Sequence, residues 1–368
     1  MTSLKVLISG GGTAGHINPA IAIAKRMERE YGADILFIGK TDGMEQTLVP
    51  KEGFPIESIE VEGLIRKLTP KNIAVAVKYI KAIARAKEII RDFAPDVVVG
   101  TGGYVCAPVL KAAHSLHIPV VVHEQNVIPG MTVKMAARFA DCVAISFDDT
   151  VNYVSEDAKK VCVLTGNPLR ENMTELSYEE ARRQLGIDDR PFIVTVGGSL
   201  GARTINNALV ELINRVDGSK VRILGGTGER FYEEVKSQIK PENLRDNIAV
   251  VPYIYNMDVV LPAADLVIAR AGAITVSELC ALGRPALLIP SPNVTHNHQE
   301  HNAKSIADKG AAVMIAERDI EGTIIYDTVE KLIFDSEKLK AMSKNARKLA
   351  ITDGTKRICD IVAGFAGK

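Results

Sequence analysis

The sequence lacks the features that mark secreted, membrane-spanning and nucleic-acid-binding proteins. Its five cysteines are far apart and form no Cys-x-x-Cys pair, which favours reduced thiols in a cytoplasmic protein. No uncharged stretch approaches the roughly 20 residues of a membrane helix, and the first residues do not have the layout of a signal peptide. The 45 basic residues balance 45 acidic ones, so no global field attracts nucleic acid. We expect a soluble or membrane-peripheral protein without a nucleic-acid partner.

The apolar pattern divides the chain into two similar halves. Short β-branched runs alternate with helix-length segments, which predicts an α/β fold with doubly wound parallel sheets. The pattern restarts after residues 166–170, where Asn167-Pro168 disfavours both helix and strand. We therefore predict two Rossmann-like domains, residues 1–165 and 166–351. Strands are expected at residues 5–9, 34–38, 56–61, 97–100, 120–123, 142–146, 161–165, 192–196, 221–224, 249–251, 266–269, 286–289 and 312–315, with a turn at 225–228 and helix from 336 to the end.

Several predicted strands lead into a glycine-rich turn that opens a helix. Residues 10–16 match the dinucleotide fingerprint G-x-G-x-x-G, but the second strand ends Phe37-Ile38-Gly39-Lys40, without the acid that holds an adenosine ribose. This absence disfavours a nicotinamide cofactor. Similar turns occur at residues 101–104 and 196–203, where Ser199 could instead cap a helix. Such turns suit phosphate groups.

Residues 266–302 predict a strand, a glycine-bearing turn, a helix over residues 274–282 and a second strand. In a parallel sheet, the free N–H groups at such a helix start bind an anion. Glu278 lies about one turn further on, where its carboxylate would accept two hydrogen bonds from a ribose diol. A phosphate beside a ribose indicates a nucleotide, although an ordinary crossover helix with a solvated Glu278 has the same spacing.

These motifs, in this order, resemble those of the MurG family of bacterial N-acetylglucosaminyltransferases. The family has Gly-Gly-Thr-Gly-Gly-His in the first turn, where this chain has Ala14 in place of one glycine. The resemblance implies the GT-B architecture, with two Rossmann-like domains facing a central cleft and a C-terminal helix, about residues 352–368, packed back on the first. It implies an inverting transfer of N-acetylglucosamine from UDP-N-acetylglucosamine to the C4 hydroxyl of the muramoyl-pentapeptide of lipid I, which gives lipid II for peptidoglycan synthesis. The matching segments are residues 10–16, 101–104, 123–126, 166–170, 196–203, 253–254, 270–278 and 297–303.

The resemblance also assigns roles to individual residues. The acceptor would contact Gly12, Gly103, Tyr104 and Asn126. His16 and Glu124 are alternative bases for the acceptor hydroxyl, and a positioning role for His16 is a third possibility. Arg170 would bind phosphate, or be an ordinary exposed linker arginine. The donor would contact Thr13, Gly15, Asn126, Arg170, Ser199, Ile254, Arg270, Gly272, Ala273, Thr275, Glu278 and Gln299.

The sequence offers little to hold a metal ion. His296, His298 and His301 have ligand-like spacing, but no cysteine and no obvious carboxylate from a third strand joins them, and a contact with the donor explains His298-Gln299 better. The chain also contains no Asp-x-Asp, the pair by which another class of sugar-nucleotide transferases chelates a cation. We expect no metal and no cofactor, so that a helix dipole, backbone N–H groups and Arg170 stabilise the leaving UDP.

Residues 66–91 contain eight basic residues and one acid, interleaved with apolar residues. A solvated basic helix packed by one face explains this composition, and so does contact with an anionic membrane. Because the family's acceptor is lipid-linked, the resemblance favours a peripheral protein on the cytoplasmic face of the cell membrane.

Two other classes share part of this pattern. A UDP-N-acetylglucosamine epimerase would need no lipid acceptor and would turn over its substrate alone. A non-catalytic sugar-nucleotide sensor would keep Arg270 and Glu278 but would have no need of His16 or of residues 123–126. Release of UDP that depends on a lipid I analogue distinguishes the transferase from both.

Overall fold

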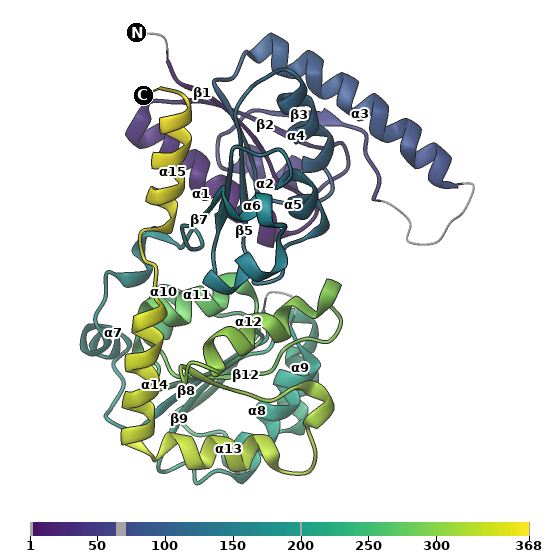
Figure 1. The fold of residues 1–368 in the computed structure, drawn as a ribbon. Helices are drawn as coiled ribbons and strands as arrows, with labels where there is room; N and C mark the ends of the chain where they lie inside the picture. The colour runs from purple at the N-terminus through teal and green to yellow at the C-terminus, as the bar shows by residue number, and fades with distance from the viewer. Residues whose placement is uncertain (1–2, 64–70, 199–200, 368) are drawn as a thin grey trace. The chain divides into compact units, whose positions relative to one another are not determined.

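The computed structural model describes residues 3–63, 71–198 and 201–367, which form two compact units. The first unit contains Met1–Leu169 and Asp353–Lys368, and the second contains Arg170–Thr352. Each is an α/β unit built on one parallel sheet (Figure 1). Residues 66–70 of the predicted basic segment and the predicted donor ligand Ser199 lie outside the described residues.

The first unit has a seven-stranded sheet in the order β3-β2-β1-β4-β5-β6-β7. All of its neighbouring strands are parallel. The order reverses between β1 and β4, and in open α/β sheets such a switch point at the carboxyl edge is the usual place for a ligand. The strands are β1 (Lys5–Ser9), β2 (Asp34–Lys40), β3 (Ile56–Ile59), β4 (Val97–Gly100), β5 (Val120–Glu124), β6 (Cys142–Ile145) and β7 (Cys162–Leu164).

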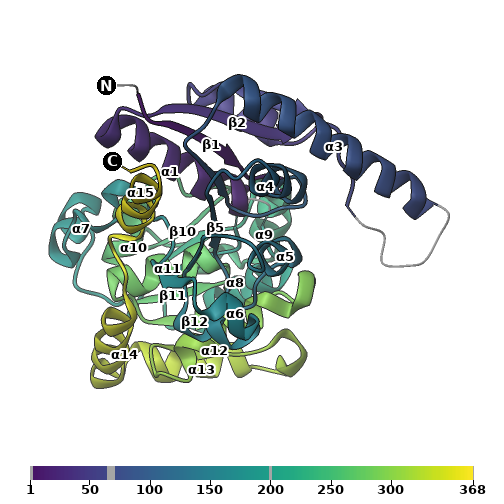
Figure 2. The ribbon, with the colours of Figure 1, turned by 45° about the horizontal axis from the view of Figure 1, so that its top comes forward.

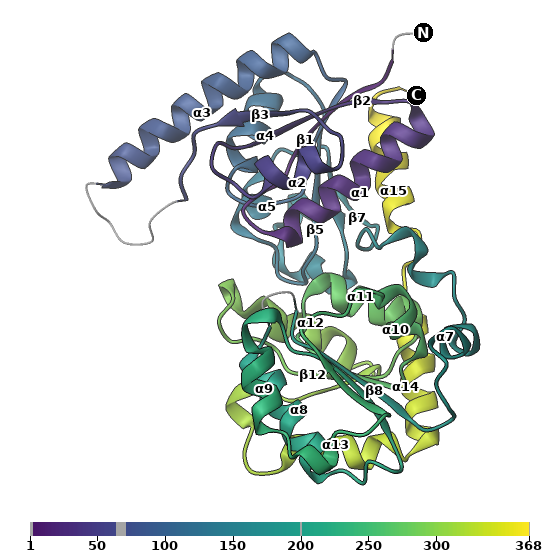
Figure 3. The same cartoon turned by 180° about the vertical axis from the view of Figure 1, so that it is seen from behind.

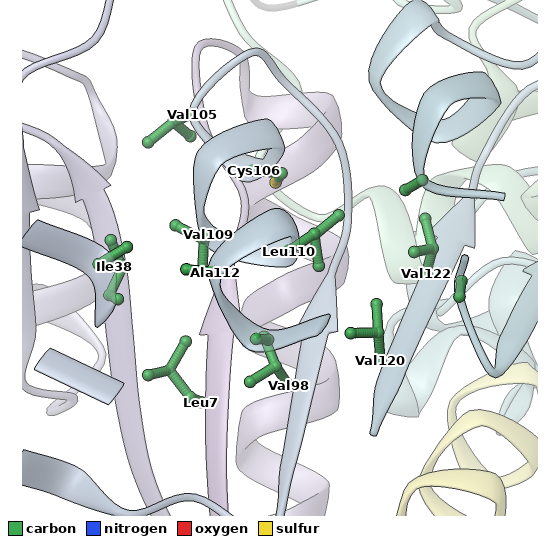
Figure 4. Packing of buried hydrophobic residues seen from close by; sticks show 14 of the residues in the cluster. Leu7, Ile38, Val98, Val105, Cys106, Val109, Leu110, Ala112, Val120 and Val122 are labelled. Carbon is green, nitrogen blue, oxygen red and sulfur yellow. The ribbon is translucent and has the colours of Figure 1, made fainter. Parts of the chain in front are cut away.

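Helices cover both faces of this sheet. On one face, Val109 and Leu110 of α4 pack over Leu7, Val98 and Val120 (Figure 4). On the other face, α15 lies beside α1, and both contribute to a second apolar cluster (Figures 1 and 3). The helices are α1 (Ala14–Tyr31), α2 (Glu45–Lys51), α3 (Lys71–Phe93), α4 (Cys106–Ser115), α5 (Met131–Ala136), α6 (Glu156–Lys159) and α15 (Gly354–Phe365).

The second unit has a six-stranded parallel sheet in the order β10-β9-β8-β11-β12-β13. Its order reverses between β8 and β11, so its switch point repeats that of the first unit. The strands are β8 (Phe192–Val196), β9 (Arg222–Gly226), β10 (Ile248–Val251), β11 (Leu266–Ala269), β12 (Ala286–Leu288) and β13 (Ala312–Met314). The helices are α7 (Tyr178–Leu185), α8 (Arg203–Arg215), α9 (Tyr232–Gln238), α10 (Met257–Ala263), α11 (Ala273–Leu282), α12 (His298–Ala307), α13 (Ile324–Ile333) and α14 (Ser336–Leu349).

Two predicted features of the second half are wrong. The expected turn at residues 225–228 is partly strand, because β9 continues to Gly226. A Cβ at Gly225 would come 2.2 Å from Leu209, so glycine lets α8 pack closely on the strand. The expected continuous C-terminal helix is broken between Leu349 and Gly354. At Gly354 a Cβ would come 2.6 Å from the Asn167 carbonyl oxygen, which shows how closely α15 begins against the end of the first unit's main segment.

Within the described parts of the chain, no helix is long and apolar enough to cross a membrane. Helix α3 packs on α4, and its first half extends beyond the rest of its unit (Figures 1 and 2). Val77 and Ile80 on this helix are 47% and 67% exposed, and the exposed Lys81 follows them.

Candidate active site

In the first unit, two glycine-rich loops meet at the switch point. The Gly11 N–H donates to the carbonyl oxygen of Gly102 over 3.3 Å. A Cβ at Gly103, whose φ is +83°, would come 2.2 Å from the Gly11 carbonyl oxygen. The loop after β1 and the loop after β4 therefore interlock through backbone contacts that only glycine permits.

His16 lies in the first turn of α1, against these loops. Its Nδ1 is 3.1 Å from the Gly11 carbonyl oxygen and 3.3 Å from Thr13 Oγ1, and Thr101 Oγ1 donates to the His16 carbonyl oxygen over 2.8 Å. The carbonyl acceptor assigns the ring proton to Nδ1, which leaves the lone pair on Nε2. The imidazole is thus oriented by the first glycine loop in the tautomer that can accept a proton.

Glu124, at the end of β5, is buried and holds the turn that follows. Its Oε1 accepts the Asn126 N–H (2.9 Å) and Nδ2 (3.1 Å), and its Oε2 accepts the Gly130 N–H (2.8 Å). Burial raises the pKa of this carboxyl group, while these hydrogen bonds act in the opposite direction. Both oxygens are committed to the backbone of one turn.

His123 and Gln125, which flank Glu124, are also buried within the first unit. His123 Nε2 lies 3.1 Å from Ser146 Oγ, and Gln125 Nε2 donates to the Thr101 carbonyl oxygen over 2.8 Å. Burial lowers the pKa of His123 to about 4, so this imidazole is neutral at physiological pH. Packing accounts for His123 and Gln125, and Asn126 is the less buried member of the predicted polar cluster.

Three of the predicted acceptor residues, Gly12, Gly103 and Tyr104, lie together in the two loops that hold His16. Gly12 has a φ of +81°, and a Cβ there would come 3.9 Å from the Tyr104 ring, which is 39% exposed. Gly103 precedes Tyr104 in the interlocked loop. Thr13 is the N-cap residue of α1, and the exposed Gly15 lies in the first turn of this helix.

In the second unit, α11 begins at the switch point with backbone N–H groups that the helix itself leaves unpaired. Gly272 is its N-cap residue, and the first helical hydrogen bond runs from the Val276 N–H to the Gly272 carbonyl oxygen (2.9 Å). The N–H groups of residues 272–275, which include Ala273 and Thr275, therefore have no partner within the helix. Asn302 Nδ2 fixes the turn by donating to the Ala271 carbonyl oxygen over 3.2 Å. These donors and the helix dipole make a site for an anion.

Glu278 lies one turn along the same helix and is only 6% exposed. Its Oε1 is 3.6 Å from Nε of Arg170, whose side chain is mostly exposed. Burial raises the pKa of Glu278, and the nearby guanidinium opposes this shift. The alternative of a solvated Glu278 is wrong, because its carboxylate is buried. Arg170 lies within ion-pair distance of Glu278 but keeps a mostly exposed side chain, so its role as a phosphate ligand stays a prediction.

Arg270 and Gln299 hold the loop that follows β12. Arg270 donates to the carbonyl oxygens of Ile289 (3.0 Å) and Pro290 (3.2 Å) and pairs with Glu317 over 2.7 Å. Gln299 Oε1 accepts the Ser291 N–H over 2.9 Å. These bonds fix the loop wall next to the α11 turn. The sequence analysis missed Glu317, because nothing in the sequence around Arg270 indicates an acid 47 residues further on as its partner.

Ile254 follows β10 at the same edge of the second sheet. It is buried, and a Cβ at Gly226 would come 3.0 Å from its Cδ1, so β9 approaches this residue closely. Tyr253 and Tyr255 on either side are exposed, with ring centroids 4.8 Å apart. Ile254 therefore lines the carboxyl edge, while its neighbours face solvent.

The described residues contain no group of three or more His, Cys, Asp or Glu side chains that could hold a metal ion. His296 has a left-handed backbone (φ +55°), and His298 Nδ1 lies 2.9 Å from the Thr295 carbonyl oxygen. A groove of about 640 Å³ lined by Tyr178, Arg284 and Arg347 lies at the opposite edge of the second sheet, since its Asp265 and Pro285 immediately precede β11 and β12. This groove is not part of the candidate site, which lies at the carboxyl edge of the same sheet.

Two Rossmann-like units with glycine turns at both switch points are typical of GT-B nucleotide-sugar transferases. Residues 6–145 match the glycosyltransferase family 28 N-terminal domain, and residues 192–358 match the family's C-terminal domain. The UDP-N-acetylglucosamine--N-acetylmuramyl-(pentapeptide) pyrophosphoryl-undecaprenol N-acetylglucosamine transferase of Acetivibrio thermocellus is 48% identical over 98% of this chain and 97% of its own. The chain therefore belongs to glycosyltransferase family 28, within it to the MurG proteins, and it is a hexosyltransferase.

Solved structures agree with this assignment. The crystal structure of Acinetobacter baumannii MurG has a TM-score of 0.82 and 29% identity, and the match covers 98% of this chain and 99% of that one. A UDP-N-acetylglucosamine 2-epimerase from Neisseria meningitidis has a TM-score of 0.68 at 14% identity, over 98% and 100% of the two chains. The second likeness shows the fold alone. The predicted GT-B fold is confirmed.

Proposed function

We propose that this protein transfers N-acetylglucosamine from UDP-N-acetylglucosamine to the C4 hydroxyl of the muramoyl-pentapeptide of lipid I, with inversion, and so forms lipid II. The observation that carries the proposal is the start of α11, where free N–H groups precede the buried Glu278 in a chain of the MurG family. The second unit takes the donor in this proposal, and the first unit takes the acceptor.

The donor's diphosphate binds the N–H groups of residues 272–275, and Arg170 neutralises part of its charge. Glu278 accepts hydrogen bonds from the two ribose hydroxyls. These bonds take the place of its contact with the mostly exposed Arg170 side chain. Gln299 contacts the sugar, and Ile254 places the uracil against the backbone. Arg270 orients the loop rather than the phosphates, because its guanidinium is already bonded to Glu317 and two carbonyl oxygens. The donor roles of Thr13, Gly15, Asn126 and Ser199 stay predictions.

The transfer is a single displacement at the anomeric carbon of the sugar. A base takes the proton of the acceptor hydroxyl, and the α11 dipole with its N–H groups stabilises the leaving UDP. His16 is the better supported base, since its Nδ1 contact leaves Nε2 with the lone pair, whereas both oxygens of Glu124 accept backbone N–H bonds. Gly12, Gly103, Tyr104 and Asn126 surround the acceptor.

The test of this function is UDP release from UDP-N-acetylglucosamine with and without a lipid I analogue. A transferase releases UDP in proportion to the acceptor. Turnover that is the same without acceptor would favour an epimerase, and saturable UDP binding without any turnover would favour a sensor. Either result would contradict the proposal.

We also propose that α3 contacts the anionic membrane that carries the acceptor. Its exposed Val77 and Ile80 lie next to Lys81 on a part of the helix that extends beyond its unit. Apolar side chains enter the headgroup boundary, and each nearby Lys or Arg adds about 1 kcal/mol of attraction to anionic lipid. In this proposal, the protein is peripheral and binds the cytoplasmic face of the cell membrane.

Replacing Val77 and Ile80 together by serine is expected to lower the binding of anionic vesicles at least ~10-fold, because each buried CH₂ contributes about 0.8 kcal/mol. Co-sedimentation with vesicles measures the effect, and UDP binding is expected to stay unchanged. The matched control replaces Leu244 and Ile324, two exposed aliphatic residues of the second unit, by serine. If both double variants sediment equally with the vesicles, α3 is a solvated helix that does not contact the membrane.

A further inference from the structure

We propose that Glu45 is a positioning residue that holds the first glycine loop, and through it His16, in the geometry needed for transfer. Glu45 is fully buried at the start of α2. Its Oε2 accepts the Gly12 N–H over 3.2 Å, and its Oε1 accepts the Lys40 N–H over 2.9 Å. One carboxylate thus joins the loop after β1 to the end of β2.

Three glycines leave the space that the Glu45 side chain occupies. A Cβ at Gly11 would come 2.4 Å from Glu45 Oε1, a Cβ at Gly43 would come 2.3 Å from the same atom, and a Cβ at Gly39 would come 2.5 Å from Glu45 Cγ. None of the three has a positive φ, so space and not backbone conformation requires glycine. Three separate positions on two loops and a strand are therefore shaped around one acidic side chain.

This pocket is suited to a carboxylate because its described donors are backbone N–H groups. Burying a charge is costly unless hydrogen bonds replace the lost water. Glu45 receives such bonds from two segments, the loop after β1 and the end of β2. Because burying this carboxylate costs free energy, we expect its hydrogen bonds to fix a loop geometry that the function needs.

The contacts continue from Glu45 to His16. Gly11 is bounded by Glu45 on one side and by the loop after β4 on the other, where its N–H donates to Gly102. The Gly11 carbonyl oxygen lies 3.1 Å from His16 Nδ1. Displacing Gly11 and Gly12 would therefore reorient the imidazole and move the proposed acceptor contact together. This inference rests on the proposed function of His16 and Gly12.

The variant Glu45→Gln tests the inference with little change in shape. Its amide offers one oxygen, and its NH₂ would face one of the two N–H donors, so one of the two segments loses its bond. Small misplacement of reacting groups can cost about 100-fold in rate, so we expect kcat with a lipid I analogue to fall about 10- to 100-fold. The KM for UDP-N-acetylglucosamine is expected to stay within twofold, since the contacts proposed for its diphosphate and ribose lie in the second unit.

Two control variants, Glu52→Gln and Gly364→Ala, and a second test variant, Gly43→Ala, separate the effect of position from the effects of charge and of added volume. Glu52→Gln makes the same charge change on an exposed acid that pairs with Lys25, and it is expected to be silent. Gly43→Ala should reproduce the Glu45→Gln defect, because the nearest atoms to its new Cβ all belong to Glu45. Gly364→Ala adds a methyl group in the same unit with nothing within 4 Å and is expected to be silent.

Hydrogen exchange of the peptide covering residues 9–16 gives a readout that does not need activity. Faster exchange there in Glu45→Gln, with parental exchange in β4 and β5, supports the inference. Unchanged kcat in an active Glu45→Gln enzyme would overturn it, and so would a fall in kcat accompanied by loss of UDP protection and of global exchange protection. If the parent enzyme shows no acceptor-dependent UDP release, the proposed function fails, and unchanged exchange of this peptide would overturn the loop contact separately.

Discussion

Replacing His16 by alanine is expected to lower kcat by about 10²- to 10⁴-fold while UDP affinity stays nearly unchanged. The reason is the contact between Nδ1 and the Gly11 carbonyl oxygen, which assigns the ring proton to Nδ1 and the basic lone pair to Nε2. Loss of a general base also removes the acidic limb of the kcat profile, because that limb reports protonation of the base. Steady-state kinetics with a lipid I analogue between pH 5 and 9 measures both effects.

Glu124→Gln provides the competing test. Burial raises the pKa of Glu124, so a base role would put the acidic limb above the range of a surface carboxylate. We expect the acidic limb to persist in Glu124→Gln. Any fall in kcat in this variant would reflect the weakened turn, because Glu124 accepts the Asn126 and Gly130 N–H groups. A limb that survives in His16→Ala and vanishes in Glu124→Gln would make the carboxylate the base. His114→Ala, on an exposed histidine of the same unit, is the control.

Strand positions were accessible from the sequence because both sheets are parallel and buried. Such strands are continuous β-branched runs, and glycine follows or ends them where a helix begins. The predicted bounds of β1, β4, β8 and β11, the four strands at the two switch points, are confirmed. The end of β9 was missed because a glycine pair usually indicates a turn, whereas Gly225 serves the close packing of Leu209. This packing is a tertiary contact, and the sequence around Gly225 does not indicate it.

The candidate site divides in the same way. The α11 turn and Glu278 are close in sequence, so their spacing indicated an anion site beside an acid, and the family resemblance favoured this over an ordinary crossover helix. The partners that hold the site are distant in sequence: Gly12 and Glu45 are 33 residues apart, and Arg270 and Glu317 are 47 apart. Arg270 stays a predicted donor ligand, but the motif gave no indication of its bonds to Glu317 and to the carbonyl oxygens of Ile289 and Pro290. The glycines around Glu45 were the one available signal of its burial.

Replacing Glu278 by alanine is expected to raise the KM for UDP-N-acetylglucosamine about 30- to 150-fold. Hydrogen bonds from the two ribose hydroxyls to a buried carboxylate are charge-assisted, and losing them costs about 2 to 3 kcal/mol. Because burial raises the pKa of Glu278, donor affinity in the parent should fall on acidification at a higher pH than a surface carboxylate would give. The alanine variant should lack this pH dependence, since it has no group to protonate.

Thermal unfolding in the presence of UDP measures the same contact without an acceptor. At 100 times the dissociation constant, a ligand stabilises the folded protein by about 2.7 kcal/mol, and a 100-fold weaker complex at the same concentration retains roughly 0.4 kcal/mol. UDP should therefore protect the second unit in the parent and hardly at all in Glu278→Ala. Glu330→Ala removes an exposed acid from the same unit and should keep full protection.

Arg170 lies beside Glu278, and its replacement by alanine gives a second comparison. Arg170→Ala is expected to weaken UDP binding less than Glu278→Ala does, because it removes phosphate charge compensation but leaves the ribose contact. Equal protection of the parent and Glu278→Ala would remove Glu278 from the donor site and leave its burial as a structural feature of α11.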